Sequence, residues 1–117
     1  MMTIIAGSRD ATKLHTWKAI QSCPWEITSV VSGTARGPDT HGILYAQWKR
    51  IPWMEFPADW DKHGKRAGIL RNEEMAKHSE ALIAVWDGVS RGTEHMIRCA
   101  KEHNLEIHVY KIKAGTS

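Results

Sequence analysis

The sequence contains few cysteines and no long apolar stretch. Cys23 and Cys99 are the only cysteines among its 117 residues, and no spacing of Cys and His resembles a zinc site. Two isolated thiols are typical of a reducing compartment. The longest apolar run, residues 81–86, is far shorter than the roughly 20 residues that cross a bilayer. Arg9 and Asp10 interrupt the N-terminal apolar run where a signal peptide would continue. The sequence therefore predicts a cytoplasmic protein with no membrane partner, no metal and no cofactor.

Two familiar phosphate-binding motifs are also missing. No GxGxxG pattern follows the first apolar run, and no GxxxxGK followed by Ser or Thr occurs anywhere. These patterns place glycines and a lysine against the phosphates of a dinucleotide or a nucleoside triphosphate. Their absence argues against a standard dinucleotide-dependent dehydrogenase and against a P-loop nucleoside triphosphatase.

The composition is that of one folded domain. Apolar residues make up 42% and charged residues 25%, with 16 Lys and Arg against 13 Asp and Glu, which gives a net charge of +3. These values are ordinary for a globular chain, and the length suits a single domain. We expect one domain over residues 1–112 and a C-terminal tail over residues 113–117. The mild positive charge permits an anionic ligand without requiring DNA.

Strand-like and helix-like segments alternate along the chain. Pro38 suits the first turn of a helix, where its missing N–H costs nothing, and Asp10 is the expected N-cap of the first helix. Alternation of this kind predicts a mostly parallel sheet with helices on both faces. The expected strands cover residues 3–6, 27–32, 53–56, 81–86 and 106–112, and the expected helices cover residues 11–22, 38–50, 64–78 and 93–103.

The character of each strand predicts its place in the sheet. Residues 81–86 are apolar throughout, as a central strand covered on both faces requires. Pro52 and Pro57 flank the third strand, which suits a sheet edge, and the fifth strand mixes polar and apolar residues. We therefore predict a single Rossmann-like three-layer α/β domain with a mostly parallel five-stranded sheet in the order 3-2-1-4-5. Its topological switch point lies between strands 1 and 4.

Residues suited to phosphate binding follow the strands, at the edge where ligands bind in such sheets. Glycine lets a backbone approach a ligand closely, hydroxyl side chains donate hydrogen bonds, and arginine binds phosphate through two N–H groups. Loops that lead into helices add free N–H groups and the helix dipole. The predicted ligand-binding residues in these loops are Gly7, Ser8, Arg9, Ser32, Gly33, Thr34, Ala35, Arg36, Gly37, Asp39, Trp60, Asp87, Gly88, Ser90, Gly92 and Thr93.

These loops resemble those of the YspA-type branch of the SLOG superfamily. The similarity extends over nearly the whole chain and includes residues 67–72, so it adds Arg71 and Asn72 to the predicted binding residues. The resemblance implies a Rossmann-like domain that binds nucleotide-derived ligands. We expect Arg9, Arg36 and Arg71 to hold the phosphate of such a ligand.

The chain is also similar to the LONELY GUY phosphoribohydrolases, which cleave the bond between a base and ribose 5-phosphate. Arg71 matches the arginine on that family's third helix, and residues 92–93 match the GT pair of its PGGxGTxxE loop. The family's glutamate falls at Met96, which cannot act as an acid or base. Arg71 with Glu94, or with Asp87 in place of Glu94, would have to hydrolyse the N-glycosidic bond.

A further similarity is to the DNA-processing protein A group, which binds single-stranded DNA during recombination. Residues 32–37 are similar to its SGxARG loop, and Arg71 with Asn72 is similar to its RN pair. Single-strand binding usually combines a basic groove with aromatic platforms on which bases stack. Trp60 is either such a platform or a rim residue that packs against the third helix.

Six tryptophans are many for a chain of this length. Trp17, Trp48 and Trp86 occupy helix-face or strand positions and are predicted to lie in the core. Trp25 and Trp53 flank strands, where an exposed tryptophan favours an interface between proteins. These two tryptophans are the basis for expecting a homodimer or a higher homo-oligomer.

Three functions fit these observations. The leading hypothesis is a sensor, sequestering or processing protein that binds a phosphate-bearing nucleotide-type small molecule, such as a mononucleotide, a dinucleotide or an ADP-ribose relative. The first alternative is an N-glycosidic-bond hydrolase acting on nucleoside monophosphates. The second alternative is a recombination accessory protein that binds single-stranded DNA.

Overall fold

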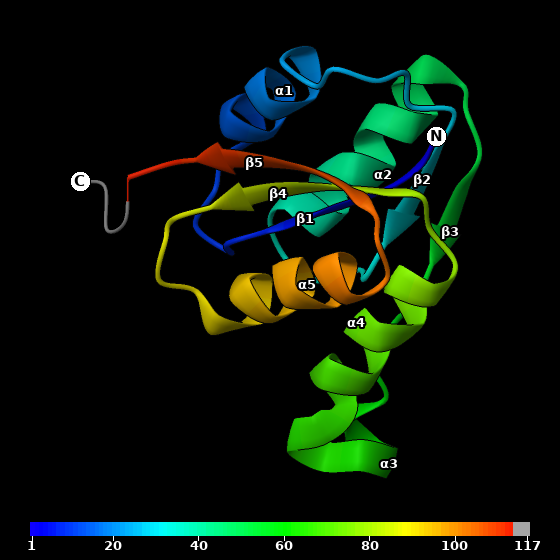
Figure 1. Cartoon of the computed structure of the whole chain (residues 1–117), viewed down its shortest axis with the longest axis vertical. Helices are drawn as coiled ribbons and strands as arrows, with labels where there is room; N and C mark the ends of the chain where they lie inside the picture. The colour runs from blue at the N-terminus through cyan, green and yellow to red at the C-terminus, as the bar shows by residue number, and fades with distance from the viewer. Residues whose placement is uncertain (114–117) are drawn as a thin grey trace.

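The computed structural model of the chain describes residues 1–113, in which strands and helices alternate as predicted (Figure 1). The part of the predicted tail beyond Lys113 lies outside the described residues. Among residues 1–113, no helix has the length and apolar character needed to cross a membrane. The strands are β1 (Met2–Gly7), β2 (Ser29–Ser32), β3 (Trp53–Glu55), β4 (Ala81–Trp86) and β5 (Glu106–Lys111), and the helices are α1 (Lys13–Gln21), α2 (Pro38–Lys49), α3 (Trp60–His63), the 3-10 turn η1 (Gly64–Arg66), α4 (Ala67–Lys77) and α5 (Arg91–Glu102).

The sheet has the predicted topology. Its five strands run in the order β3-β2-β1-β4-β5, and every neighbouring pair is parallel. The apolar strand β4 lies inside the sheet, and β3, bounded by Pro52 and Pro57, forms one edge. The prediction of a Rossmann-like α/β domain is therefore confirmed, and the strand order reverses between β1 and β4.

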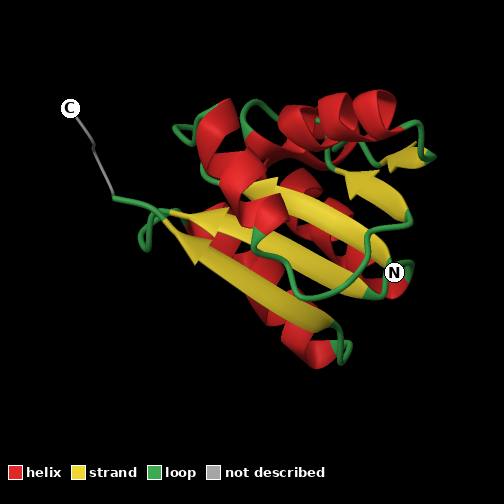
Figure 2. Cartoon of the chain, turned by 90° about the horizontal axis from the view of Figure 1, so that it is seen from above, coloured by secondary structure: helices red, strands yellow, loops and turns green. Residues whose placement is uncertain are grey.

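Helices cover both faces of the sheet, so the core has two layers (Figures 1 and 2). Side chains that alternate along β1 point to opposite faces. Ile4 belongs to the cluster that packs under α4 and α5, and Ile5 belongs to the cluster under α1 and α2; both are fully buried. The two layers fix the positions from which the loops at the strand ends emerge.

Most helix boundaries differ from the predicted ones by one to three residues, and two of these differences have a clear local cause. The N-cap of α1 is Thr12 instead of Asp10, because Thr12 Oγ1 accepts a hydrogen bond from the His15 backbone N–H while His15 Nδ1 accepts one from the Thr12 N–H. The third predicted helix is shorter than residues 64–78. Gly64 has a φ of 56°, outside the helical region, so the chain forms α3 and η1 before α4 begins at Ala67.

The prediction that Trp48 lies in the core is wrong, because its side chain is 73% exposed. The buried stripe of α2 passes through Asp39, Gly42 and Ala46. Trp48 is two residues beyond Ala46, which turns it by about 200° around the helix, away from the sheet.

The other tryptophans are partly covered. Trp17 is half-buried with its ring 6.2 Å from the ring of Tyr45, and the half-buried Trp86 donates from Nε1 to the Ser90 carbonyl. Trp25 is half-buried and donates to Thr3, whereas Trp53 is 39% exposed on the edge strand. The expectation of a homo-oligomer stays a prediction.

Replacing Gly7 with alanine is expected to destabilise the protein by about 3 kcal/mol. The added Cβ would collide with the Val85 carbonyl oxygen, a backbone atom that already accepts the Ser8 N–H at 2.9 Å and cannot move aside. Urea unfolding measures the loss. Gly92→Ala is the matched control because its added Cβ would meet no atom within 4 Å, and alanine in a helix is favoured over glycine by up to about 1 kcal/mol. Equal stabilities for the two variants would contradict this account of Gly7.

Candidate functional site

Two adjoining cavities lie at the carboxyl edge of the sheet, where the predicted loops meet. The smaller has a volume of about 480 Å³, and its lining includes Pro57 and Ala58 from the loop after β3. The larger has a volume of about 850 Å³ and extends along α4 to the start of α5. Each volume is within the range of roughly 300–1,000 Å³ that small-molecule sites occupy. The residues that line both cavities are Arg9, Ala35, Arg36, Trp60 and Arg71.

Most of the predicted binding residues line these cavities, and four do not. The lining residues come from the end of β1, from the loops after β1, β2 and β4, and from α2, α3, α4 and α5, segments far apart in the sequence. The predicted residues that line one or both cavities are Gly7, Ser8, Arg9, Gly33, Thr34, Ala35, Arg36, Asp39, Trp60, Arg71, Asn72, Ser90, Gly92, Thr93 and Glu94. The predicted residues outside the cavity lining are Ser32, Gly37, Asp87 and Gly88.

The loop between β2 and α2 is held in shape by its own polar side chains. The fully buried Ser32 donates from Oγ to the Asp39 carbonyl at 2.8 Å and accepts the Thr34 N–H at 3.1 Å. Asp39 Oδ2 accepts the Ala35 N–H at 3.1 Å. Thr34 has a φ of 62° and Gly37 a φ of 91°, so the loop turns through two left-handed positions. Ser32 and Gly37 therefore shape the loop that presents Arg36 to the cavities.

Asp39 is a buried carboxyl group inside this basic site. It is 5% exposed, and burial raises its pKa to about 6, although the Ala35 N–H and the positive charges of Arg71 and Arg9 lower it. Burial destabilises the ionised form, and the two arginines offset only part of that cost. At neutral pH Asp39 is therefore largely ionised, although its buried surroundings favour the protonated form.

Arg71 joins α4 to the loop after β2. Its Nη1 donates to the Gly33 carbonyl at 2.6 Å, and its Nε donates to Asn72 Oδ1 at 3.0 Å. A Cβ at position 33 would stand 2.5 Å from Nη1, so glycine is required for this approach. The pKa of Arg71 is below its ordinary value, mainly because the side chain is buried. The charge of Asp39 raises this pKa, and the positive charge of Arg9 lowers it. Arg71 and Arg9 therefore repel each other, and an anion between them would relieve that repulsion.

Arg9 and Arg36 are exposed at the mouth of the cavities. Across residues 1–113, neither guanidinium has a hydrogen-bond or ion-pair partner. Each guanidinium therefore has all of its donors available for an anionic ligand.

The loop after β4 is tied to the loop after β1. Asp87 accepts hydrogen bonds from the backbone N–H groups of Val89 and Ser90 and from the Ser90 hydroxyl, and its own N–H donates to Ser8 Oγ. Burial alone would raise the pKa of Asp87, but these hydrogen bonds bring it below its ordinary value. Gly88, with a φ of 87°, forms the turn against the Lys111 side chain. Asp87 and Gly88 thus set the start of α5 instead of facing the cavity.

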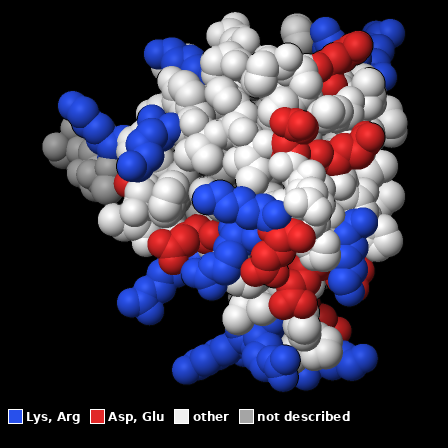
Figure 3. Space-filling view, in the orientation of Figure 1, with Lys and Arg blue, Asp and Glu red and all other residues white. Residues whose placement is uncertain are grey.

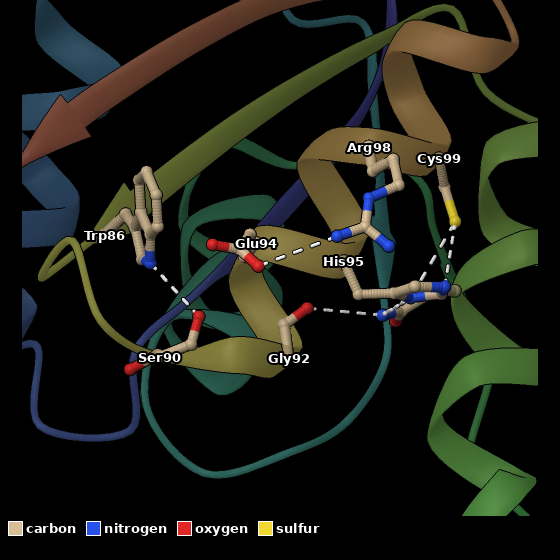
Figure 4. Close-up of polar contacts among 8 residues, drawn as sticks. Trp86, Ser90, Gly92, Glu94, His95, Arg98 and Cys99 are labelled. Atoms are coloured by element: carbon tan, nitrogen blue, oxygen red, sulfur yellow. Dashed lines mark hydrogen bonds and ion pairs between the residues drawn. The ribbon is translucent and has the colours of Figure 1, made fainter.

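A chain of polar contacts at α5 was missed by the sequence reasoning (Figure 4). Arg71 Nε can only donate, so Asn72 Oδ1 is the acceptor of their hydrogen bond. The other end of the amide, Asn72 Nδ2, then faces the Gly92 carbonyl at 3.4 Å and His95 Nδ1 at 3.1 Å. His95 Nδ1 is then an acceptor, and the ring hydrogen is on Nε2, 3.6 Å from Cys99 Sγ. His95 lines the larger cavity. The only signal in the sequence was its position two residues after Thr93.

The residues proposed for hydrolysis are only partly arranged for it. Glu94 and Arg71 line the same cavity, but Glu94 pairs with Arg98 at 3.6 Å, and both of those side chains are more than half exposed. Figure 4 shows this pair on the surface of α5. Met96, at the position of the hydrolases' glutamate, is 1% exposed and packs in the core.

The fold and the site define the chain as a Rossmann-like α/β domain with an arginine-lined crevice at its topological switch point. No family model matches the chain. It is 36% identical over 117 aligned positions to the Gene 61 protein of Mycobacterium phage D29, with 89% of this chain and 91% of that protein covered. The chain therefore belongs to the family of the phage Gene 61 protein.

A solved structure shares the fold at low sequence identity. The X-ray structure of DNA processing protein A (DprA) from Streptococcus pneumoniae is similar with a TM-score of 0.71 and 19% identity, over 91% of this chain. The match covers 48% of the solved chain, so this chain spans about half its length. The similarity establishes the shared α/β architecture.

Proposed function

We propose that the chain binds single-stranded DNA, with backbone phosphates in the crevice at the carboxyl edge of the sheet. The observation that carries the proposal is the convergence of Arg9, Arg36 and Arg71 on cavities whose rim holds an exposed tryptophan, Trp60. A groove lined by arginines and an aromatic platform are the two components of a single-strand site, and the guanidiniums of Arg9 and Arg36 have no partner within residues 1–113. The printed name of the solved neighbour, a DNA processing protein, supports this choice.

The larger cavity has a surplus of positive charge. Six Lys and Arg residues line it against three Asp and Glu residues, and one of the acidic residues, Glu94, is already paired with Arg98. Phosphate neutralisation by such a surface releases condensed counterions, so binding should weaken as salt rises. The direct test is fluorescence anisotropy of a dye-labelled twelve-nucleotide thymidine strand over a series of salt concentrations. Binding with a negative salt slope is expected, whereas undetectable or salt-independent binding would refute the proposal.

Replacing Trp60 with alanine is expected to weaken strand binding by about 5-fold or more, because one stacked base contributes about 1–3 kcal/mol. The Trp60 ring lies over the backbone of Gly68, 3.3 Å from where a Cβ would stand, and remains 54% exposed. The variant should fold normally, since α3 buries no residue. Trp60→Phe keeps an aromatic face and should retain most of the affinity. Trp48→Ala removes a more exposed tryptophan outside the cavities and should leave binding unchanged; an equal loss in both alanine variants would argue against stacking on Trp60.

A nucleotide-type small molecule is the second candidate ligand. The volume of the smaller cavity, about 480 Å³, favours it, and so does Thr93, which is 6% exposed, lines the larger cavity and has no hydrogen-bond partner for its hydroxyl within residues 1–113. The loop motifs that resemble the SLOG superfamily support the same candidate. Nucleotides that raise the melting temperature while thymidine strands do not would select it. Release of free base from a nucleoside monophosphate would select the hydrolase alternative built on Arg71 and Glu94.

A further inference from the structure

Residues 60–66, which form α3 and η1, project from one end of the molecule and contribute nothing to its core. Neither element buries a residue, and all seven residues are exposed. Figure 1 shows α3 beyond the end of α4, away from the sheet, and Figure 3 shows Lys and Arg gathered over this end. Gly64 separates the two elements of this projection. Its φ of 56° interrupts the helix between α3 and η1, and no atom lies within 4 Å of where its Cβ would stand. The amino acids of residues 60–66 are therefore not explained by packing against the core.

Three cations stand together on this projection, and we call Lys62, Lys65 and Arg66 the basic arm. Within residues 1–113, none of the three has an ion-pair or side-chain hydrogen-bond partner. Asp59, which comes just before them, accepts the Lys62 backbone N–H as the N-cap of α3. Asp61, the one acidic residue of the segment, is also exposed and forms no ion pair with these three cations, so residues 60–66 carry a net positive charge with the cationic groups available.

The basic arm continues directly from the crevice. Trp60, the first residue of α3, lines both cavities, and Lys65 lines the larger one. A ligand with one phosphate held by Arg9, Arg36 and Arg71 occupies the crevice alone. A ligand that also reaches Lys62 and Arg66, outside the cavity lining, must extend past Trp60 and carry further phosphates.

We infer that the basic arm is a second phosphate-binding surface, which holds the backbone of a DNA strand where the strand leaves the crevice. This inference rests on the proposed function and refines it, since it makes a polynucleotide the preferred ligand over a single nucleotide. The crevice binds one part of the strand, Trp60 stacks a base at its rim, and the basic arm binds the phosphates beyond.

The test compares a triple variant of the arm, Lys62→Ala with Lys65→Ala and Arg66→Ala, with the wild-type protein. Anisotropy titrations of the twelve-nucleotide thymidine strand over a salt series give both affinity and salt slope. Removing three phosphate contacts should reduce the magnitude of the slope of log K against log salt by about 2 and weaken binding at least about 10-fold at moderate salt. Because the three side chains are exposed and have no ion-pair or side-chain hydrogen-bond partner within residues 1–113, the variant should keep the wild-type melting temperature.

A charge-matched control removes Lys13, Lys18 and Lys49, exposed residues of α1 and α2 outside both cavities. The control should retain the wild-type slope. An arm variant with wild-type slope and affinity, or a control that loses as much as the arm variant, would overturn the inference about the arm. In either case the crevice proposal stands if Arg36→Ala still weakens strand binding. Failure of the wild-type protein to bind the strand would overturn the proposed function, and the arm's role with it.

Discussion

Replacing Arg9 and Arg36 together with alanine is expected to weaken binding of single-stranded DNA by about 100-fold or more, with no loss of folding stability. A hydrogen bond to a charged group contributes about 1.5–3 kcal/mol, and two arginine–phosphate contacts are removed. Both guanidiniums are exposed and lack partners within residues 1–113, so their loss leaves no buried group unpaired. Anisotropy titration measures the affinity, and thermal unfolding measures the stability.

The matched control for this double variant is Lys18→Ala with Lys49→Ala, which removes the same charge from α1 and α2. It should bind the strand within about twofold of wild type at moderate salt, because neither lysine lines the cavities and salt screens charges that do not contact the strand. Equal losses in the two double variants would mean that net charge alone, and not the crevice, determines binding.

Replacing Asp39 with asparagine is expected to stabilise the protein by about 3 kcal/mol at pH 7 and to have no effect on stability below about pH 4. The pKa of Asp39 rises from an ordinary value of 3.8 to about 6 because of burial, which corresponds to roughly 3 kcal/mol. Between these two values the folded state binds a proton that the unfolded state has released. The contribution of Asp39 to stability is therefore highest below pH 4 and is lost as pH rises to about 6. Asparagine is neutral throughout and keeps an oxygen for the Ala35 N–H.

Urea unfolding of wild type and Asp39→Asn at several pH values between about 4 and 8 tests this expectation. Asp10→Asn, which neutralises an exposed carboxylate at the same end of the sheet, is the control and should show no comparable gain. A difference between wild type and Asp39→Asn that stays constant with pH would contradict the assignment. Because the carboxylate lies near Arg9 and Arg71, its removal should also strengthen phosphate binding at neutral pH.

The topology of the sheet could be predicted because each strand carries its position in its composition. The apolar run of residues 81–86 and the prolines at positions 52 and 57 were sufficient to place a centre and an edge. The start of the first helix was harder to predict. Thr12 and Asp10 are both good N-caps, and only the reciprocal hydrogen bonds with His15 select Thr12. The exposure of Trp48 follows from the orientation of α2, which is set by Gly42 packing on Ile5.

The candidate site could be outlined from the sequence, but its internal organisation could not. The loops after strands of a parallel sheet meet at one edge, so the meeting of Arg9 and Arg36 at the crevice follows from the topology. The pairing of Arg71 with the Gly33 carbonyl and the contact between Asn72 and His95 depend on how α4 packs beside α5. The basic arm was hidden because residues 60–66 contain no apolar periodicity, and Gly64 looked like the start of a longer helix.

The central claim is that a nucleic-acid strand binds where the loops after β1, β2 and β4 meet. Nuclear magnetic resonance titration of the isotope-labelled protein with a four-nucleotide thymidine strand tests it most directly. The account predicts that the backbone amide signals of Gly33, Arg36 and Thr93 shift together and saturate at one strand per protein, while those of Lys18 and Trp48 stay in place. Shifts confined to α1 and α2, with the loop signals unmoved at saturation, would contradict it.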